Sequence, residues 1–292
     1  MPLDCIKKKL LSEVSTLGIG GPAKLYVEVK TVEEMIQALS FCKVEKLSFF
    51  ILGKGSNSLF DDRGFDGVII HNKIDFIEEN DEGHFHVGAG YSFSLLGMQT
   101  AKKGFTGLEF AAGIPASVGG AVFMNAGAQG KETCSHLVSV EFIDADGNAH
   151  HLKKEDLEFG YRFSSFQKMQ GAIISARFQL AKSKTAKKEQ RELLDYRIKT
   201  QPYHEKSAGC VFRNPVNGSA GALIDKSGLK GISIGDAEVS FMHANFLINK
   251  GNATSDDFKK LMDEVRNKVR EVHGVDLEVE IRLVPYKGPN CD

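Results

Sequence analysis

The fold of this chain is decided by the glycine-rich stretch GIPASVGGAVFMNAG at residues 113–127. Small residues dominate it and supply little side-chain volume for a hydrophobic core. Backbone without bulky side chains can lie directly against a ligand or a flat ring system. The stretch therefore favours ligand contact, and a close-packed structural turn is the alternative.

A second glycine-rich stretch, GKGSNS at residues 53–58, follows a short apolar run at 49–52 that predicts a buried strand. Glycine lets backbone N–H groups approach phosphate oxygens closely, and Ser56 and Asn57 can add hydrogen bonds. The stretch is neither GxGxxG nor GxxxxGK[ST], so an ordinary tight turn is the other interpretation. Two such stretches suit a long, doubly phosphorylated cofactor, which indicates an enzyme rather than a binding module.

Local patterns predict the secondary structure on either side of these glycine-rich stretches. A strand at 26–29, a helix opened by a capping box at Thr31, and apolar runs at 49–52 and 68–70 predict a small α/β unit. A second block follows, with a strand at 84–90, a helix at 95–103, a hairpin at 137–152 with an Asp-Gly turn, and a closing strand at 173–180. The third block holds a linker helix at 187–200, an amphipathic helix from Ser255 to Gly274 and a strand at 277–284.

Composition excludes several classes of protein. The 292 residues allow two or three domains, and a hydrophobic content of 42% is enough for real cores. A net charge of -1 gives no indication of nucleic acid or an anionic membrane, no segment reaches the roughly 18 apolar residues of a membrane span, and we expect no signal peptide. The five cysteines include no CxxC pair, which fits a reducing cytoplasm.

Two patterns that resemble metal sites have simpler explanations. A calcium loop beginning at Asp144 would need glycine at its sixth position, where the chain has Ala149, so a hairpin turn is favoured. His84 and His86 share one face of a strand, but no third ligand is evident. We therefore predict no metal.

Three side chains suggest chemistry. Cys210 lies in the segment SAGCVFRNP, where nearby positive groups would make the thiol acidic enough to transfer protons, although a small buried hydrophobe is the alternative. Arg162 could hold a carboxylate with two hydrogen bonds. Glu280 shares one strand face with Glu278, and solvent exposure of one or both is the alternative to a catalytic role.

Taken together, these motifs resemble the UDP-N-acetylenolpyruvoylglucosamine reductases, the flavoenzymes of bacterial peptidoglycan precursor synthesis. The matching stretches keep the family's order and cover nearly the whole chain; they lie at 16–23, 53–58, 113–127, 161–162, 207–215, 244–249, 251–254 and 277–282. The resemblance implies an α+β fold. It implies a two-part FAD-binding domain of the vanillyl-alcohol-oxidase (PCMH) type at 1–70 and 71–182. A C-terminal α+β substrate domain would follow at 183–292, with the linker helix 187–200 at its start.

The resemblance also implies a reaction. NADPH would reduce non-covalently bound FAD and leave, and UDP-N-acetylglucosamine enolpyruvate would take its place. A hydride would pass from flavin N5 to C3 of the enolpyruvyl group, and an acid would protonate C2 to give UDP-N-acetylmuramate. We expect a cytoplasmic monomer that serves cell-wall biogenesis, and with it cell shape and division, without nucleic acid or membrane partners.

Site residues follow from the same resemblance. Cys210 takes the proton-donor position, where many members have Ser, and a thiol is the stronger acid. Arg162 and Glu280 match the residues that stabilise developing negative charge, which requires Glu280 to be protonated or bonded through a partner. Substrate contacts are expected at Tyr161, Asn214, Lys206 and His243. Cofactor contacts are expected at Gly53, Lys54, Gly55, Ser56, Asn57, Ser58, Gly113, Ser117, Gly119, Asn125 and Gly127.

The chain departs from the family pattern in places. The short interval from Tyr161 to Arg197 leaves little room for the tyrosine-bearing loop of longer members, which implies the compact subtype. Val279 stands where many members have Pro, and Lys54 where many have Gly. Two other functions stay open: an FAD oxidase of a small alcohol or sugar, and a nucleotide-sugar-binding protein without redox chemistry.

Overall fold

A computed structural model describes residues 4–216 and 218–286. Over these residues the chain forms two compact units. Unit 1 takes residues 4–6, 25–54 and 67–197, and unit 2 takes residues 7–24, 55–66, 198–216 and 218–286. The first glycine stretch is therefore divided between the units after Lys54. The expected division at residues 70 and 182 stays a prediction.

A four-stranded sheet leads into the first glycine stretch. Its order is β1 (Ile6–Lys7), β2 (Ala23–Val29), β5 (Phe65–Asn72) and β3 (Phe49–Leu52), and β3 pairs in parallel with β5. Helix α1 (Val32–Val44) begins with the predicted capping box, in which Thr31 and Glu34 each accept a backbone hydrogen bond from the other. The predicted strand and helix order is confirmed here.

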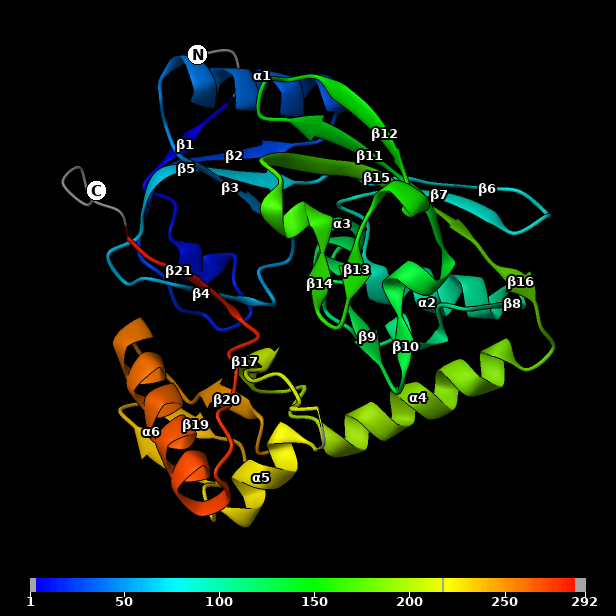
Figure 1. The fold of residues 1–292 in the computed structure, drawn as a ribbon. Helices are drawn as coiled ribbons and strands as arrows, with labels where there is room; N and C mark the ends of the chain where they lie inside the picture. The colour runs from blue at the N-terminus through cyan, green and yellow to red at the C-terminus, as the bar shows by residue number, and fades with distance from the viewer. Residues whose placement is uncertain (1–3, 217, 287–292) are drawn as a thin grey trace. The chain divides into compact units, whose positions relative to one another are not determined.

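A five-stranded antiparallel sheet forms the second layer of unit 1. Its order is β12 (Ala149–Lys153), β11 (Leu137–Asp144), β15 (Gly171–Gln179), β7 (His84–Gly88) and β6 (Ile77–Glu79). The predicted hairpin is confirmed, because β11 pairs with β12 and the Gly147 N–H closes the turn on the Asp144 carbonyl. Helices α1 and α3 (Val118–Phe123) contact β15 from opposite faces (Figure 1).

Helix boundaries differ from the predicted ones where a capping side chain decides them. Helix α2 (Phe93–Lys102) begins two residues earlier than expected because the Ser92 hydroxyl accepts from the Leu95 N–H. The second glycine stretch contains α3, a helix that the sequence did not predict. Ser117 caps it by accepting from the Gly120 N–H. The linker helix α4 is found at Ala186–Thr200.

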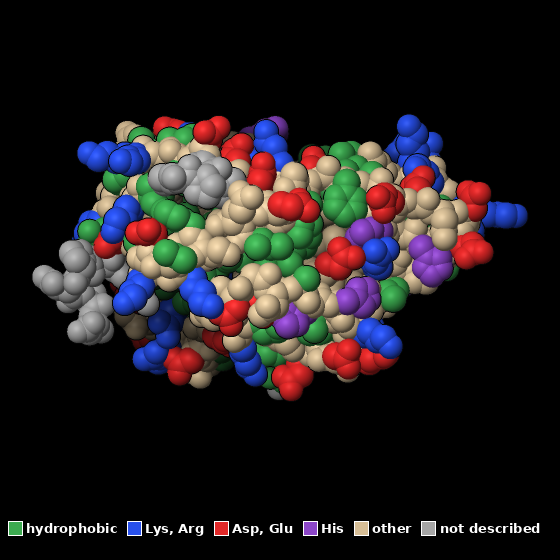
Figure 2. Space-filling model, turned by 90° about the horizontal axis from the view of Figure 1, so that it is seen from above, with side chains coloured by type: hydrophobic (Ala, Val, Ile, Leu, Met, Phe, Trp, Pro, Cys, Tyr) green, Lys and Arg blue, Asp and Glu red, His purple; other side chains and the backbone are tan. Residues whose placement is uncertain are grey.

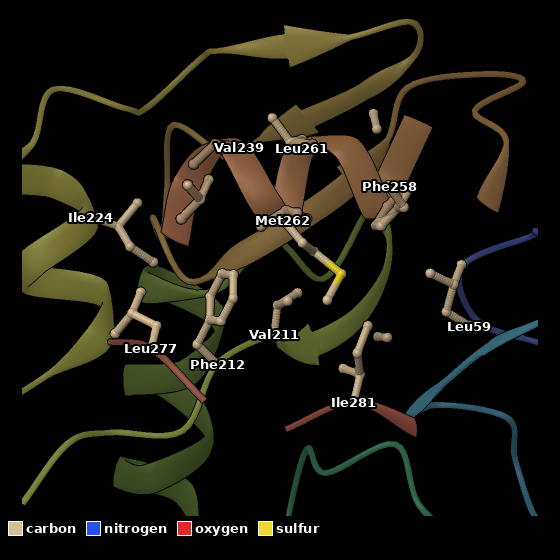
Figure 3. Close-up of a cluster of buried hydrophobic side chains, with 14 of the residues drawn as sticks. Leu59, Val211, Phe212, Ile224, Val239, Phe258, Leu261, Met262, Leu277 and Ile281 are labelled. Carbon is tan, nitrogen blue, oxygen red and sulfur yellow. The ribbon is translucent and has the colours of Figure 1, made fainter. Parts of the chain in front are cut away.

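Unit 2 is built on a four-stranded sheet and two helices. The sheet order is β17 (Lys206–Cys210), β20 (Phe246–Asn249), β19 (Ala237–Val239) and β18 (Ser233–Ile234). Helix α6 (Ser255–His273) buries the predicted stripe against this sheet and α5 (Ala220–Lys226); Figure 3 shows the Met262 side chain pointing from α6 toward Val211. Gly274 ends α6 with a φ of 67° as predicted. The predicted stripe consists of Phe258, Leu261, Met262, Val265, Val269 and Val272; the first five are buried, and Val272, in the last turn of α6, is 48% exposed.

The expected strand at 277–284 is wrong in its extent. Only β21 (Arg282–Val284) is a strand, and it pairs in parallel with β4 (Ser58–Phe60). Val279 instead bridges to Phe212, and the Glu280 N–H donates to the Val211 carbonyl. The segment changes partners within a few residues, so it cannot be one continuous strand.

The remaining elements are short. The two-residue strands are β8 (Phe105–Thr106), β9 (Gly127–Ala128), β10 (Lys131–Glu132), β13 (Phe159–Gly160), β14 (Phe163–Ser164) and β16 (Ala181–Lys182). The 3-10 helices are η1 (Leu11–Glu13), η2 (Glu109–Ala111), η3 (Thr133–His136), η4 (Lys154–Asp156) and η5 (Ser165–Lys168).

The surface gives no sign of a nucleic-acid site on the face that Figure 2 shows, where basic and acidic side chains are interspersed. No helix within the described ranges is long and apolar enough to cross a membrane. Within residues 4–216 and 218–286, no group of three or more His, Cys, Asp or Glu side chains is arranged to hold a metal ion. The four described cysteines are thiols rather than disulfides, and Cys291 lies outside the described residues.

Asp61 is expected to contribute strongly to stability in unit 2. It is 5% exposed, and its carboxylate accepts from the Arg63 backbone N–H at 3.0 Å and from the Arg63 guanidinium at 2.8 and 2.9 Å, with Lys259 at 3.4 Å. These donors hold the pKa of Asp61 well below its usual range. Its contribution is therefore complete above the unfolded pKa of about 3.9 and is lost as the pH falls below it. We predict that Asp61→Asn lowers the free energy of unfolding by about 2–3 kcal/mol at pH 7, and by less at pH 3.

Urea denaturation at the two pH values measures this effect. Asp225→Asn is the matched control, because its ion pair with Lys230 is exposed to solvent and is worth under about 1 kcal/mol. Equal losses in the two variants at pH 7 would contradict the prediction.

Candidate active site

The two glycine stretches meet inside unit 1. A Cβ placed on Gly53 would lie 2.4 Å from the Ser117 Oγ, closer than any real contact allows. Ser117 in turn forms a β-bridge with Ser92, and the Lys54 ammonium donates to the Ser92 Oγ at 2.7 Å. Gly53 and Ser117, 64 positions apart in sequence, thus meet at one point, and glycine at position 53 leaves room there for the Ser117 hydroxyl.

The electrostatic potential is positive where the two glycine stretches meet. Ser92 caps the N-terminus of α2, where the helix dipole and unpaired N–H groups favour an anion. Lys54 is exposed, but the surrounding protein still desolvates its ammonium, and this desolvation together with the nearby Lys73 lowers the pKa of Lys54. A bound anion would relieve the repulsion between the two lysines, so the residues present here fit a phosphate group.

Gly113 and Gly119 of the second stretch also have structural roles. A Cβ on Gly119 would lie 2.9 Å from the Ala89 Cβ, and the Gly119 N–H donates to the Ala89 carbonyl. Gly113 has a φ of +81°, and its N–H donates to the Ser94 hydroxyl at 2.8 Å. Close packing thus accounts for Gly119, and cofactor contact by either glycine stays a prediction.

Asn125 and Gly127 support Arg162. Asn125 is fully buried with a φ of 42°, and its amide donates to the Glu132 carboxylate and the Gly160 carbonyl, both at 2.9 Å. Its oxygen accepts from the Cys134 N–H. These bonds engage both amide hydrogens of Asn125. They tie the second glycine stretch to the hairpin that carries Arg162. Cofactor contact by Asn125 stays a prediction.

Arg162 is held in a strained backbone conformation at the tip of the β13–β14 hairpin. Its φ is 56°, a left-handed value that costs a side-chain-bearing residue about 1–2 kcal/mol. The Gly127 carbonyl accepts from its guanidinium at 3.1 Å, the Tyr161 ring lies 5.0 Å from the guanidinium carbon, and the Arg162 carbonyl accepts from Gln167. Such strain persists where surrounding contacts fix it, and it is found most often at functional sites.

In unit 2, the rest of the first glycine stretch has a donor available for a ligand. Gly55 has a φ of 63°, and a Cβ there would lie 2.3 Å from the Val14 carbonyl oxygen. Ser58 begins β4, and the Asn57 carbonyl accepts from the Arg282 N–H. The Asn57 Nδ2 is a buried amide nitrogen without a hydrogen-bond partner among the described residues. Buried donors are normally satisfied, so Asn57 fits a bound acceptor such as a cofactor oxygen. No contact in the described residues assigns a role to Ser56.

Cys210 and Glu280 come from neighbouring segments of unit 2. Cys210 ends β17 directly after a bulge at Gly209, whose φ is 79°, and bulges often re-aim a side chain beside an active site. The Val211 carbonyl accepts from the Glu280 N–H at 2.7 Å, and Asn245 holds Phe212 through both its backbone groups. Cys210 and Glu280 are both half-buried.

The substrate-binding residues expected in unit 2 do not all lie together. Asn214 accepts from the Ala220 N–H at the start of α5, and the His243 ring lies against Gly221 of the same helix. Burial lowers the pKa of His243, so its ring is neutral near pH 7. Lys206 lies at the other end of β17 from Cys210, beside Gly18. Tyr161 and Arg162 belong to unit 1.

Sequence reasoning assigned no role to Ser92 or Asn245. Ser92 lies directly before an apolar helix, and this capping position could have indicated it. Asn245 stood in a matching stretch, but nothing local showed that it holds Phe212, because that contact joins residues 33 positions apart.

Comparisons with known proteins point to one family. A family model described as "UDP-N-acetylenolpyruvoylglucosamine reductase, C-terminal domain" matches residues 201–284, and one described as "FAD binding domain" matches residues 23–153. The UDP-N-acetylenolpyruvoylglucosamine reductase of Protochlamydia amoebophila (strain UWE25) is 58% identical over 95% of this chain and 93% of its own length. The chain belongs to the UDP-N-acetylenolpyruvoylglucosamine reductase family.

Other members of the family support the assignment. The reductase of Chlamydia felis (strain Fe/C-56) is 47% identical over 96% of this chain and 94% of its own. A crystal structure of UDP-N-acetylenolpyruvylglucosamine reductase (MurB) from Thermus caldophilus has a TM-score of 0.82 and 37% identity, covering 98% of this chain and all of that one. The predicted family, the α+β fold with an FAD-binding domain and the oxidoreductase class are confirmed.

Proposed function

We propose that this reductase-family chain uses NADPH and non-covalent FAD to reduce UDP-N-acetylglucosamine enolpyruvate to UDP-N-acetylmuramate. The observation that carries the proposal is the convergence of Gly53, Lys54 and Ser117 on one phosphate-compatible point inside the region matched by the FAD-binding model. Relatives that align over nearly the whole chain and are named for this activity support the substrate.

The FAD would be held by residues of both glycine stretches. Backbone around Gly53 and Lys54 would bind phosphate oxygens, Ser117 would lie beside them, and Asn57 would donate to a cofactor oxygen. Flavin held by these residues would supply the hydride chemistry, from NADPH to C3 of the enolpyruvyl group.

The protein's own part is to bind, orient and supply a proton. Cys210 Sγ would donate a proton to C2 as charge develops there. Arg162, fixed by its strained hairpin, would stabilise the negative charge that grows on the substrate carboxylate. Glu280 can help only if it is protonated or acts through a hydrogen-bonded partner. Tyr161, Asn214, Lys206 and His243 would contact the substrate.

Further parts of the proposal concern the setting. We propose that the enzyme acts in the cytoplasm as a monomer, in peptidoglycan precursor synthesis. The free thiols of the four described cysteines and the absence of CxxC pairs in the sequence support this location, because disulfides form and persist in oxidising compartments and are rare in the cytosol.

An anaerobic absorption experiment tests the function. We expect purified protein to show flavin bands that bleach when NADPH is added and return when the enolpyruvyl substrate is added. Bands that bleach but return only with oxygen would indicate an oxidase instead. Protein that shows no bands even after FAD is added would leave a nucleotide-sugar-binding protein as the better explanation.

A further inference from the structure

The segment at residues 16–18 begins one of the stretches that resemble the family, and the proposed mechanism gives it no role. It lies in unit 2 between η1 and β2. The Leu17 side chain is fully buried in the core of that unit, and the Leu17 carbonyl accepts from the Asn249 side-chain amide at 3.0 Å. Asn249 is the last residue of β20, so the segment is fixed to the sheet that also contains β17.

Thr16 contacts two parts of the proposed site at once. Its backbone N–H donates to the Gly55 carbonyl at 3.3 Å. Its Oγ1 lies 2.6 Å from the Ser207 carbonyl oxygen and 3.5 Å from the Gly55 carbonyl oxygen. A hydroxyl has one proton to donate, and the shorter contact is the stronger hydrogen bond. The Thr16 side chain therefore holds Ser207, and the Thr16 backbone holds Gly55.

The backbone contact supports the first glycine stretch. Gly55 packs directly on the backbone before Thr16, since a Cβ on Gly55 would lie 2.3 Å from the Val14 carbonyl oxygen and 2.9 Å from the Ser15 Cα. The Thr16 N–H adds a hydrogen bond to this close contact. Asn57, whose buried amide fits a cofactor oxygen, follows two residues after Gly55. The segment thus fixes the part of the stretch that would bind the cofactor.

The side-chain contact supports the strand that carries Cys210. Strand β17 lies at one edge of the four-stranded sheet and pairs with β20. The pairing is regular at Lys206 and Ser207, is interrupted by the bulge, and resumes at Cys210. A bulge disrupts the ladder locally, so Ser207 is the last regularly paired residue before Cys210. The Thr16 hydroxyl holds the Ser207 carbonyl from outside the ladder and so fixes the strand at the point where the bulge begins.

We propose that Thr16 is a positioning residue for the proton transfer from Cys210. Its hydroxyl holds β17 at Ser207, while its backbone N–H holds the first glycine stretch at Gly55. A proton donor must lie within hydrogen-bond reach of the atom that it serves, and a small displacement of the donor slows the reaction. The proposal rests on the proposed function and adds a residue to it. Thr16 acts through Cys210 and transfers no proton itself.

Anaerobic stopped-flow absorbance of Thr16→Val tests the proposal, because valine keeps the shape of threonine and lacks the hydroxyl. We expect the return of flavin colour with the enolpyruvyl substrate to be about 10-fold slower, since the Ser207 carbonyl loses its donor. Bleaching by NADPH and the Kd for FAD should stay within about 2-fold of wild type, because the N–H that holds Gly55 remains. Thr16→Ser restores the hydroxyl and should stay within about 2-fold in all three measurements.

Thr100→Val is the matched control. The Thr100 hydroxyl is fully buried and donates to the Leu96 carbonyl at 2.9 Å inside α2, so the same atoms are exchanged within unit 1. Both half-reactions of this variant should proceed at wild-type rates. A Thr100→Val variant that is as slow as Thr16→Val in the second half-reaction would show that the effect is not specific to Thr16, and would count against the inference.

A double variant separates positioning of Cys210 from a general loosening of unit 2. When Cys210 is already replaced by alanine, no thiol is left to position. Thr16→Val should then slow the second half-reaction by less than about 2-fold, because two residues that act through one group are not additive. The same loss of about 10-fold in both backgrounds would overturn the inference.

The outcomes also distinguish this inference from the proposed function. Wild-type protein whose flavin colour does not return with the enolpyruvyl substrate would overturn both. A folded Thr16→Val variant that regains colour as fast as Thr16→Ser would overturn the inference alone, and so would one that loses affinity for FAD to the same extent as it loses rate. If Thr16→Val does not fold, Thr16→Ala takes its place with the same expected results.

Discussion

Cys210→Ala is expected to lower turnover of the enolpyruvyl substrate by about 10³-fold while leaving reduction of the flavin by NADPH unchanged. Alanine keeps the backbone of β17 and its bulge but carries no proton to donate. Hydride delivery and proton delivery fall in the second half of the proposed cycle, so only that half should slow. Anaerobic stopped-flow absorbance separates the two halves, because flavin bleaching follows the first and recovery of colour follows the second.

Two variants make this test specific. Cys210→Ser keeps a proton donor of similar size, and we expect turnover within about 10-fold of wild type, because the hydroxyl can still donate although it is a weaker acid. Cys134→Ala removes a different half-buried thiol, in unit 1, and should leave both half-reactions unchanged. Full turnover by Cys210→Ala would show that the proton comes from another group.

Gly53→Ala is expected to have the largest effect on cofactor binding. The new methyl would lie 2.4 Å from the Ser117 Oγ, so either the Ser117 hydroxyl would have to turn away from the Gly120 N–H that it caps or the two glycine stretches would have to separate. Overpacking of this kind typically costs about 1–3 kcal/mol, which corresponds to a loss of FAD affinity of about 5- to 150-fold. Titration of apoprotein with FAD measures the effect.

The structure also supplies a rescue. Apart from the Ser117 Oγ, the nearest atom to the new methyl is the Ser117 Cβ at 3.4 Å, an ordinary contact. Gly53→Ala combined with Ser117→Ala should therefore bind FAD more tightly than Gly53→Ala alone, even though the loss of the Ser117 cap costs α3 about 1 kcal/mol. If the second substitution gives no recovery, the clash is not the reason for the loss.

Local signals predicted the elements that they control. Thr31 and Glu34 indicated the start of α1, and the apolar stripe and Gly274 indicated α6 and the position where it ends. Helix α3 was missed because glycine and small residues are poor helix signals on their own, and Ser117 alone decides where it begins. The extent of the strand at 277–284 was wrong because hydrophobic alternation does not say that a segment will change partners midway.

The candidate site, like the fold, could be predicted from the sequence only in part. The glycine stretches were predictable because their composition is unusual for a core, and the resemblance to the family indicated Cys210, Arg162 and Glu280. The hold of Asn245 on Phe212 was not predictable, because it joins two segments 33 positions apart that only the fold brings together. Contacts that depend on the register of distant strands leave no local pattern.

The interleaving of the two units has a consequence for the order of folding during synthesis. The core of unit 2 buries Leu17, Ile19 and Leu59 together with residues of β20 and α6. Those early side chains leave the ribosome long before their partners, and at about 5–20 residues per second the delay is on the order of ten to forty seconds. The nascent chain must therefore carry unburied apolar segments on both sides of α1 until its last helix emerges, and surface of this kind is prone to aggregation.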